Sequence, residues 1–261
     1  MAVKLKVDDH LARQKMKKLL RLTGKSEKTF IREQASLMAE TCARATPPFV
    51  TYRPFTGSMG SLADKKQGMS AVVKDLSKVF TIREEGYIRF VIKRFGTENN
   101  VSGTLRGSKG EYKIDSPLVT LDLEKAKKFY ESKRQASGRP SKGSQADSWS
   151  KAFVTKKMFD TMVKTKFKAL GIAKASFAKA VVRLNPKKKA SKWISQHFGR
   201  VNTTVVEKQG KGYSVVINAS AKGLQYVTNK IGGFSQRRMQ MAKKKLEGDY
   251  RRQIRQSGFR R

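Results

Sequence analysis

Residues 171–220 read GIAKASFAKAVVRLNPKKKASKWISQHFGRVNTTVVEKQGKGYSVVINAS, and this stretch decides the fold. Its first part predicts an amphipathic helix, because apolar residues recur there at steps of three and four. Asn185-Pro186 ends the helix, since the residue before a proline avoids the helical conformation. Two segments rich in β-branched residues follow, 201–208 and 213–219, and the glycines between them supply the positive φ angles of a tight hairpin. The stretch therefore predicts a helix followed by an antiparallel strand pair.

The same periodicity extends upstream, so we expect one helix over residues 153–184. Ser26 has the side chain of an N-cap, and Pro47-Pro48 stops the helix that it begins. A last helix starts near Leu224, is interrupted by Gly232-Gly233 and resumes at Ser235. The helix that Ser26 begins spans 27–45, and further helices are predicted over residues 8–22, 69–80 and 121–135.

Residues 87–95, YIRFVIKRF, alternate β-formers with charged residues and predict a strand. Three segments are rich in glycine, proline and small polar residues and predict mobile loops: 49–68, 96–110 and 137–148. The last of these, SGRPSKGSQADS, has the composition of a linker.

Together these patterns predict an α+β fold, in which long amphipathic helices pack on a small antiparallel sheet and basic flexible loops connect them. We expect an N-terminal helical region with an inserted β and loop segment at residues 1–136. The linker follows at 137–148, and a C-terminal α+β module occupies 149–261 with a long helix, a hairpin and a basic final helix.

The charge is extreme for a folded chain. The 261 residues carry 58 Lys and Arg against 20 Asp and Glu, a formal net charge of +38 that is spread along the sequence. Self-repulsion of this size opposes compaction unless anions neutralise it. Nucleic acid, a phosphate-rich surface and acidic partner subunits are the candidate anions, so the composition predicts a partner.

Catalytic and metal-binding patterns are absent from the sequence. There are two histidines, far apart, and one cysteine, Cys42, which lies in an apolar stripe and is expected to be a small buried hydrophobe. Gly24-Lys25-Ser26 resembles the end of a P-loop, but Leu19 stands where that motif requires glycine. We therefore expect no enzyme and no cofactor.

No apolar run approaches the roughly 20 residues that cross a bilayer, and the N-terminus lacks the apolar core of a signal peptide. With a single cysteine, no disulfide forms within the chain. These features predict an intracellular product with no membrane partner.

Five segments carry a resemblance to a known family: 30–49 (FIREQASLMAETCARATPPF), the loop 138–143 (GRPSKG) at the place of a flexible insertion, 171–184, 192–200 (KWISQHFGR) and the hairpin 201–220. They resemble the neck or tail-completion proteins of tailed bacteriophages, the minor virion components that join head and tail. Two features depart from that family, an inserted region at about 87–116 and a far more basic composition. A basic ring that lines the DNA channel, or that faces acidic portal subunits, would account for the second.

The resemblance implies a non-enzymatic structural virion protein that is assembled in the host cytoplasm into an oligomeric ring at the neck. It implies portal, neck and tail proteins as partners, together with non-specific contact with DNA. Three apolar residues are expected to pack subunits together, namely Phe177, Trp193 and Ile194. Ten cations are expected to contact partner or phosphate, namely Lys187, Lys188, Lys189, Arg237, Arg238, Lys243, Lys244, Lys245, Arg251 and Arg252.

The sequence leaves two alternative functions to consider. The charge alone also fits a non-catalytic protein that binds nucleic acid without sequence preference, such as a ribosome-associated or DNA-packaging factor. A nuclease would need a cluster of metal-binding carboxylates, and the sequence contains no such cluster.

Overall fold

The computed structural model describes residues 2–5, 26–107, 110–133, 151–209, 213–221 and 224–256. The chain divides into two compact units, and both mix helices with short strands, which confirms the α+β class. Unit 1 combines residues 1–67 with residues 171–261, and unit 2 consists of residues 68–170. Unit 2 is thus an insertion between the two halves of unit 1.

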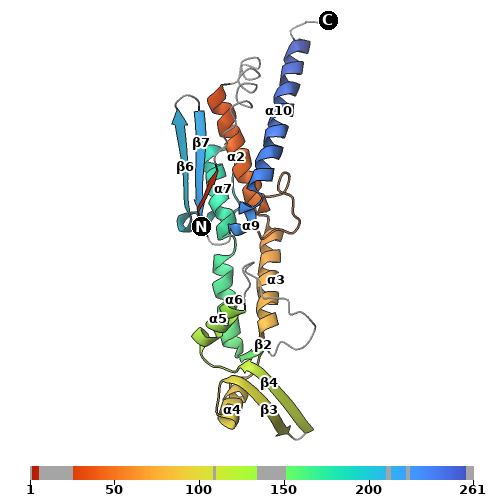
Figure 1. Ribbon diagram of the computed structural model, residues 1–261, viewed down its shortest axis with the longest axis vertical. Helices are drawn as coiled ribbons and strands as arrows, with labels where there is room; N and C mark the ends of the chain where they lie inside the picture. Colours follow the sequence, from red (N-terminus) through yellow and green to blue (C-terminus); the bar gives the residue numbers. More distant parts are fainter. Residues whose placement is uncertain are drawn as a thin grey trace. The chain divides into compact units, whose positions relative to one another are not determined.

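Unit 1 is built on a three-stranded antiparallel sheet with the order β1-β7-β6. Two helices, α2 and α7, pack against this sheet, and α10 packs on α2 (Figure 1). The elements of the unit are β1 (Ala2–Leu5), α2 (Glu27–Ala45), α7 (Ile172–Leu184), α8 (Lys192–Ser195), η1 (Phe198–Arg200), β6 (Asn202–Gln209), β7 (Tyr213–Ser220), α9 (Gln225–Thr228) and α10 (Ile231–Gln256). The predicted hairpin is confirmed, with Val205 opposite Ile217 on the face that α7 covers.

Helix α2 has the predicted bounds, because its ends are set by local chemistry. The Ser26 side chain accepts a hydrogen bond from the backbone N–H of Thr29, and Pro47-Pro48 follow the last turn. The faces of α2 and α7 that meet are rich in alanine, so the two backbones approach closely. Ala39 of α2 and Ala180 of α7 are both fully buried in one cluster.

Trp193 and Ile194 are held in unit 1 by two glycines. The Trp193 indole N–H donates to the carbonyl oxygen of Gly60 at 2.8 Å. A Cβ on Gly60 would lie 2.6 Å from Ile194, and one on Gly171 would lie 2.5 Å from the Trp193 ring. Gly171 also has φ +88, a conformation that other residues adopt only at a cost. Position 171 therefore requires glycine for two reasons: there is no space for a Cβ, and the backbone has a positive φ angle.

Gly171→Ala is expected to lower the unfolding free energy of unit 1 by about 2–4 kcal/mol, the sum of left-handed strain and overpacking against Trp193. Gly248→Ala is the matched control, because nothing lies within 4 Å of a Cβ at this site inside α10. The control should gain about 0.5–1 kcal/mol. Urea titration followed by Trp193 fluorescence, in a Trp149→Phe background, measures both. An unchanged Gly171→Ala protein would contradict the packing.

Unit 2 contains two small sheets: a short parallel strand pair, β2-β5, and a long antiparallel hairpin, β3-β4. Its main core lies among α3, β2, α5, β5 and α6, with Leu76, Ala126 and Val154 fully buried. Its elements are β2 (Phe80–Ile82), α4 (Glu85–Phe95), β3 (Asn99–Gly107), β4 (Gly110–Leu118), α5 (Leu123–Ser132), β5 (Ala152–Val154) and α6 (Lys156–Ala169). Helix α3 (Leu62–Val79) begins in unit 1 and continues into unit 2.

Two predictions for residues 87–110 of unit 2 are wrong. Residues 87–95 form helix α4 and not a strand, because the buried residues Ile88 and Val91 lie on one helical face. Residues 99–107 form strand β3 and not a loop, since β4 supplies partners for their backbone groups. Gly103 lets the Phe95 ring approach this strand, where a Cβ would lie 2.4 Å from the ring.

The predicted helix over residues 153–184 is three elements. Residues 152–154 form β5, the helix that follows is α6, which ends at Ala169, and Gly171 with its positive φ precedes α7. Helix α3 begins at Leu62, earlier than predicted, and α10 continues through Gly232-Gly233 without a break.

The two units differ from the division that the sequence predicts. The N-terminal β1 and α2 pack on the C-terminal β7 and α7, so residues from both ends of the chain share one core. The predicted linker at 137–148 and the predicted helix at 8–22 lie outside the described residues.

Candidate partner-binding surface

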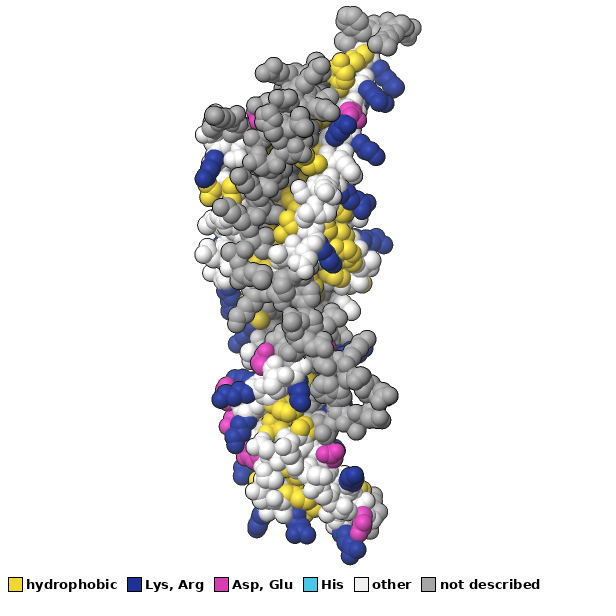
Figure 2. Space-filling model, viewed as in Figure 1, with side chains coloured by type: hydrophobic (Ala, Val, Ile, Leu, Met, Phe, Trp, Pro, Cys, Tyr) yellow, Lys and Arg dark blue, Asp and Glu magenta, His cyan; other side chains and the backbone are white. Residues whose placement is uncertain are grey.

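Helix α10 carries most of the cations that the sequence singles out. Its inward face is formed by Phe234, Arg238, Ala242 and Leu246, which are buried and recur at every fourth residue. The cations that remain exposed lie off this face, namely Arg237, Lys243, Lys244, Lys245, Arg251, Arg252 and Arg255. Figure 2 shows Lys and Arg side chains in dark blue along the edge that α10 forms.

Few of these charges are neutralised by the helix itself. Lys243 pairs with Glu247 at 3.7 Å, and Arg252 pairs with Asp249 at 2.8 Å. No carboxylate among the described residues forms an ion pair with the other exposed cations of α10, namely Arg237, Lys244, Lys245, Arg251 and Arg255. The helix therefore presents a surplus of positive charge to solvent.

Two of the ten predicted contact residues face inward. Lys188 forms an ion pair with the buried Glu40 of α2, and Arg238 is 8% exposed. The neighbours Lys187 and Lys189 are exposed, in the turn that follows α7. The structure thus separates eight exposed cations from two whose charge is used inside unit 1.

Glu40 is the centre of a buried group of charges. Its carboxylate accepts from Arg44 at 2.5 Å and from Lys188, while Arg238 donates from Nε to Thr41 at 2.8 Å. Burial lowers the pKa of Arg238, repulsion from Arg44 adds to this effect, and attraction to Glu40 opposes it. One carboxylate therefore pairs with two cations, Arg44 and Lys188, and also attracts a third, Arg238.

The Phe55 ring accepts two of the α10 guanidinium groups. Arg237 lies 4.5 Å and Arg238 lies 5.2 Å from the ring centroid. The carbonyl oxygen of Phe55 also accepts a hydrogen bond from Arg44 at 2.6 Å. These contacts hold the first turns of α10 against the segment of unit 1 that contains Phe55.

A second buried cation is less well compensated. Lys174, in the first turn of α7, is fully buried, and its Nζ lies 4.0 Å from Asp64 without a hydrogen-bond partner among the described residues. Asp64 instead accepts the backbone N–H groups of Val50 and Ser61. Burial lowers the pKa of Lys174 to about 8, and the attraction of Asp64 only partly offsets this.

The three residues predicted to pack subunits together lie in the interior of unit 1. Phe177 and Ile194 are fully buried and Trp193 nearly so, all within this chain. Helix α2 covers the alanine-rich face of α7. These residues therefore stabilise the unit itself and are not available to a neighbour.

Strand β6 does offer an edge. It pairs only with β7 among the described strands, and Val206 is 39% exposed. An edge strand presents unpaired backbone N–H and C=O groups on one side. Residues 202–206 therefore belong to an edge that no other described strand covers.

The described residues hold no arrangement typical of a catalytic site. Cys42 is buried as expected, and burial raises the pKa of its thiol to about 12. No group of three or more His, Cys, Asp or Glu in the described part of the chain could hold a metal ion.

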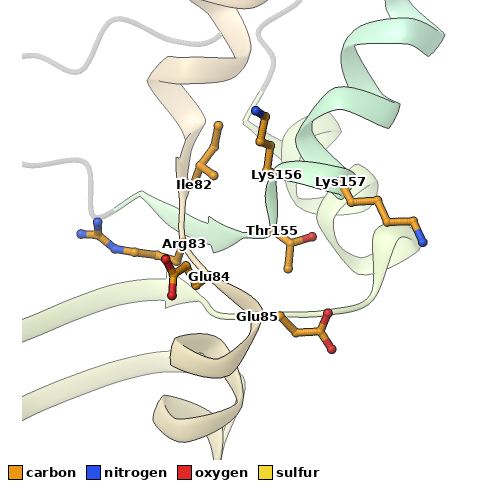
Figure 3. A pocket seen from close by; sticks show the side chains of 7 residues that line it. All are labelled: Ile82, Arg83, Glu84, Glu85, Thr155, Lys156 and Lys157. Atoms are coloured by element: carbon orange, nitrogen blue, oxygen red, sulfur yellow. The ribbon is translucent and has the colours of Figure 1, made fainter.

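A shallow hollow of about 430 Å³ lies in unit 2, where β2 and β5 end and α4 and α6 begin. In Figure 3 the side chains of Arg83, Lys156 and Lys157 point away from one another. Because Glu84 and Glu85 also line it, the hollow has mixed charge and no convergent set of groups.

None of the described helices combines the length and the apolar character that crossing a lipid bilayer requires. In comparisons with known proteins, no family model, no curated protein and no solved structure matched this chain.

Proposed function

We propose that this chain is a structural virion protein of a tailed phage, which acts in the neck or in tail completion and joins head to tail. One observation carries the proposal. Of the five segments that resemble the family, 138–143 lies outside the described residues, and the other four, 30–49, 171–184, 192–200 and 201–220, belong to unit 1. They supply α2, α7, α8 and the β6-β7 hairpin, which pack together although unit 2 separates them in the sequence.

Assembly is the proposed mechanism. The subunits form a ring at the neck, and the edge of β6 pairs with a strand of a neighbouring subunit or of a tail protein. The exposed cations of α10 and the turn residues Lys187 and Lys189 contact acidic portal subunits or DNA. No catalytic step is part of this function.

Deletion of the gene from the virus that encodes the chain tests the proposal. We expect filled heads and complete tails that stay separate, with joined infectious particles restored when the wild-type chain is supplied in trans. Electron microscopy of the lysate and a plaque count measure both results. Joined particles at wild-type yield without the protein would contradict the proposal, and so would a gene that no virus carries.

A second function is non-catalytic nucleic-acid binding outside a virion, as a ribosome-associated or packaging factor. The net charge of +38 favours it. It predicts that the deletion leaves head–tail joining intact.

A further inference from the structure

We propose that the outer face of α10 binds the phosphate backbone of double-stranded DNA. The binding surface is the cation stripe, defined as Arg237, Lys244, Arg251 and Arg255. This inference deepens the proposed function, which leaves acidic subunits and DNA as alternatives for α10, and it can be tested on the isolated chain whether or not the chain joins head to tail.

The stripe is set by helix geometry. Arg237, Lys244 and Arg251 recur at every seventh residue, which is almost two full turns, so they lie on one face about 10.5 Å apart along the axis. Arg255 continues the row one turn later, to a total length of about 27 Å. The buried residues Ala242 and Leu246 lie on the opposite face, where they pack in one cluster with Phe30 of α2.

The charges of the stripe are available to a ligand. Lys244, Arg251 and Arg255 are exposed and form no ion pair with the described residues, whereas the two acidic residues of α10 are paired with the flanking Lys243 and Arg252. Arg237 is exposed while it stacks on Phe55, a contact that orients its guanidinium.

Double-stranded DNA fits this surface better than an acidic protein does. The duplex carries one charge per ~1.7 Å of axis, so a straight row of cations meets phosphates along its whole length. A helix of ~10–12 Å diameter also enters the ~12 Å major groove. Protein interfaces are depleted in lysine and have an apolar centre, whereas the exposed apolar residues of α10, Met241 and Ile254, lie to the sides of the stripe.

The test compares two triple variants of equal net charge. One replaces the stripe residues Lys244, Arg251 and Arg255 with glutamine. The control replaces Lys93, Arg94 and Lys113 of unit 2 with glutamine. These three residues are also exposed and form no ion pair with described residues. Fluorescence anisotropy of a labelled 30-base-pair duplex of random sequence is measured between about 50 and 300 mM NaCl, the range over which phosphate contacts change affinity steeply.

For the stripe variant we expect the slope of log K against log salt to fall in magnitude by about 2.7, and the affinity at 0.1 M salt to fall roughly 500-fold. The control should stay within about threefold of wild type, and circular dichroism should show both variants folded. Equal losses in the two variants would overturn the proposal, because they would show only diffuse charge. Wild-type affinity in the stripe variant would overturn it too. So would poly-glutamate that displaces the duplex at equal charge concentration, which would point to an acidic protein ligand.

Discussion

Glu40→Gln is expected to lower the unfolding free energy of unit 1 by about 3 kcal/mol. The substitution keeps the shape of the side chain and removes its charge. Arg44, Lys188 and Arg238 then lie near one another with no carboxylate between them. Breaking a buried ion pair costs about 3–5 kcal/mol of unfolding free energy. We expect a loss at the lower end of this range, because Lys188 is partly exposed and can turn to solvent.

Glu33→Gln is the matched control for this change. Glu33 lies on the same helix, changes the net charge by the same amount and is exposed. Its effect should stay within about 0.5 kcal/mol. Urea titration of the Trp149→Phe background compares the two variants. Equal stability of the two would show that Glu40 does not organise the buried cations.

Lys174→Met is expected to raise the unfolding free energy of unit 1 by about 3 kcal/mol near pH 7. The pKa of Lys174 falls from 10.5 to about 8 on folding, so the buried charged form destabilises the folded state at neutral pH. Methionine fills the same space without a charge, and Asp64 keeps the backbone N–H groups of Val50 and Ser61 as donors.

The stability advantage of Lys174→Met over the wild type depends on pH. Below pH 8 the lysine is charged in both states and the full penalty applies. Between pH 8 and 10.5 folding releases its proton, so the wild type gains stability as the pH rises. The advantage of Lys174→Met should therefore shrink by about 2 kcal/mol between pH 7.5 and 9.5. Urea titrations at the two pH values measure this, with the exposed Lys192→Met as control. A constant difference, or a less stable variant, would contradict the burial of an uncompensated charge.

Local chemistry in the sequence predicts the elements that end on a clear signal. Ser26 and Pro47-Pro48 set the ends of α2, and the glycines after Gln209 separate the strands of the hairpin. The nine residues of the 87–95 segment fit a strand and a helix equally well, because in so short a stretch the two patterns overlap. Only the packing of Ile88 and Val91 decides for α4.

Long-range pairing could not be predicted. Nothing near Ala2–Leu5 in the sequence indicates that this strand pairs with β7, more than two hundred residues later. The same holds for the insertion of unit 2, which appears only when both halves of unit 1 are seen in one core.

The sequence predicts that the candidate surface is positively charged. It does not predict for every cation whether the side chain faces solvent or the interior. The outward direction of Lys244 and Arg251 follows from helical spacing once α10 is assigned. Arg238 follows Phe234 at four residues, and this spacing was the available signal that it faces inward. For Lys188, which lies in a turn, the sequence holds no such signal, since its partner Glu40 belongs to another helix.

The head–tail joining function depends on where the protein lies in a particle. A tag at the C-terminus, marked with gold and viewed in intact virions by negative-stain electron microscopy, measures this directly. We expect one cluster of gold per particle at the junction between head and tail. Gold over the capsid faces, along the length of the tail, or absent from purified virions would contradict the account.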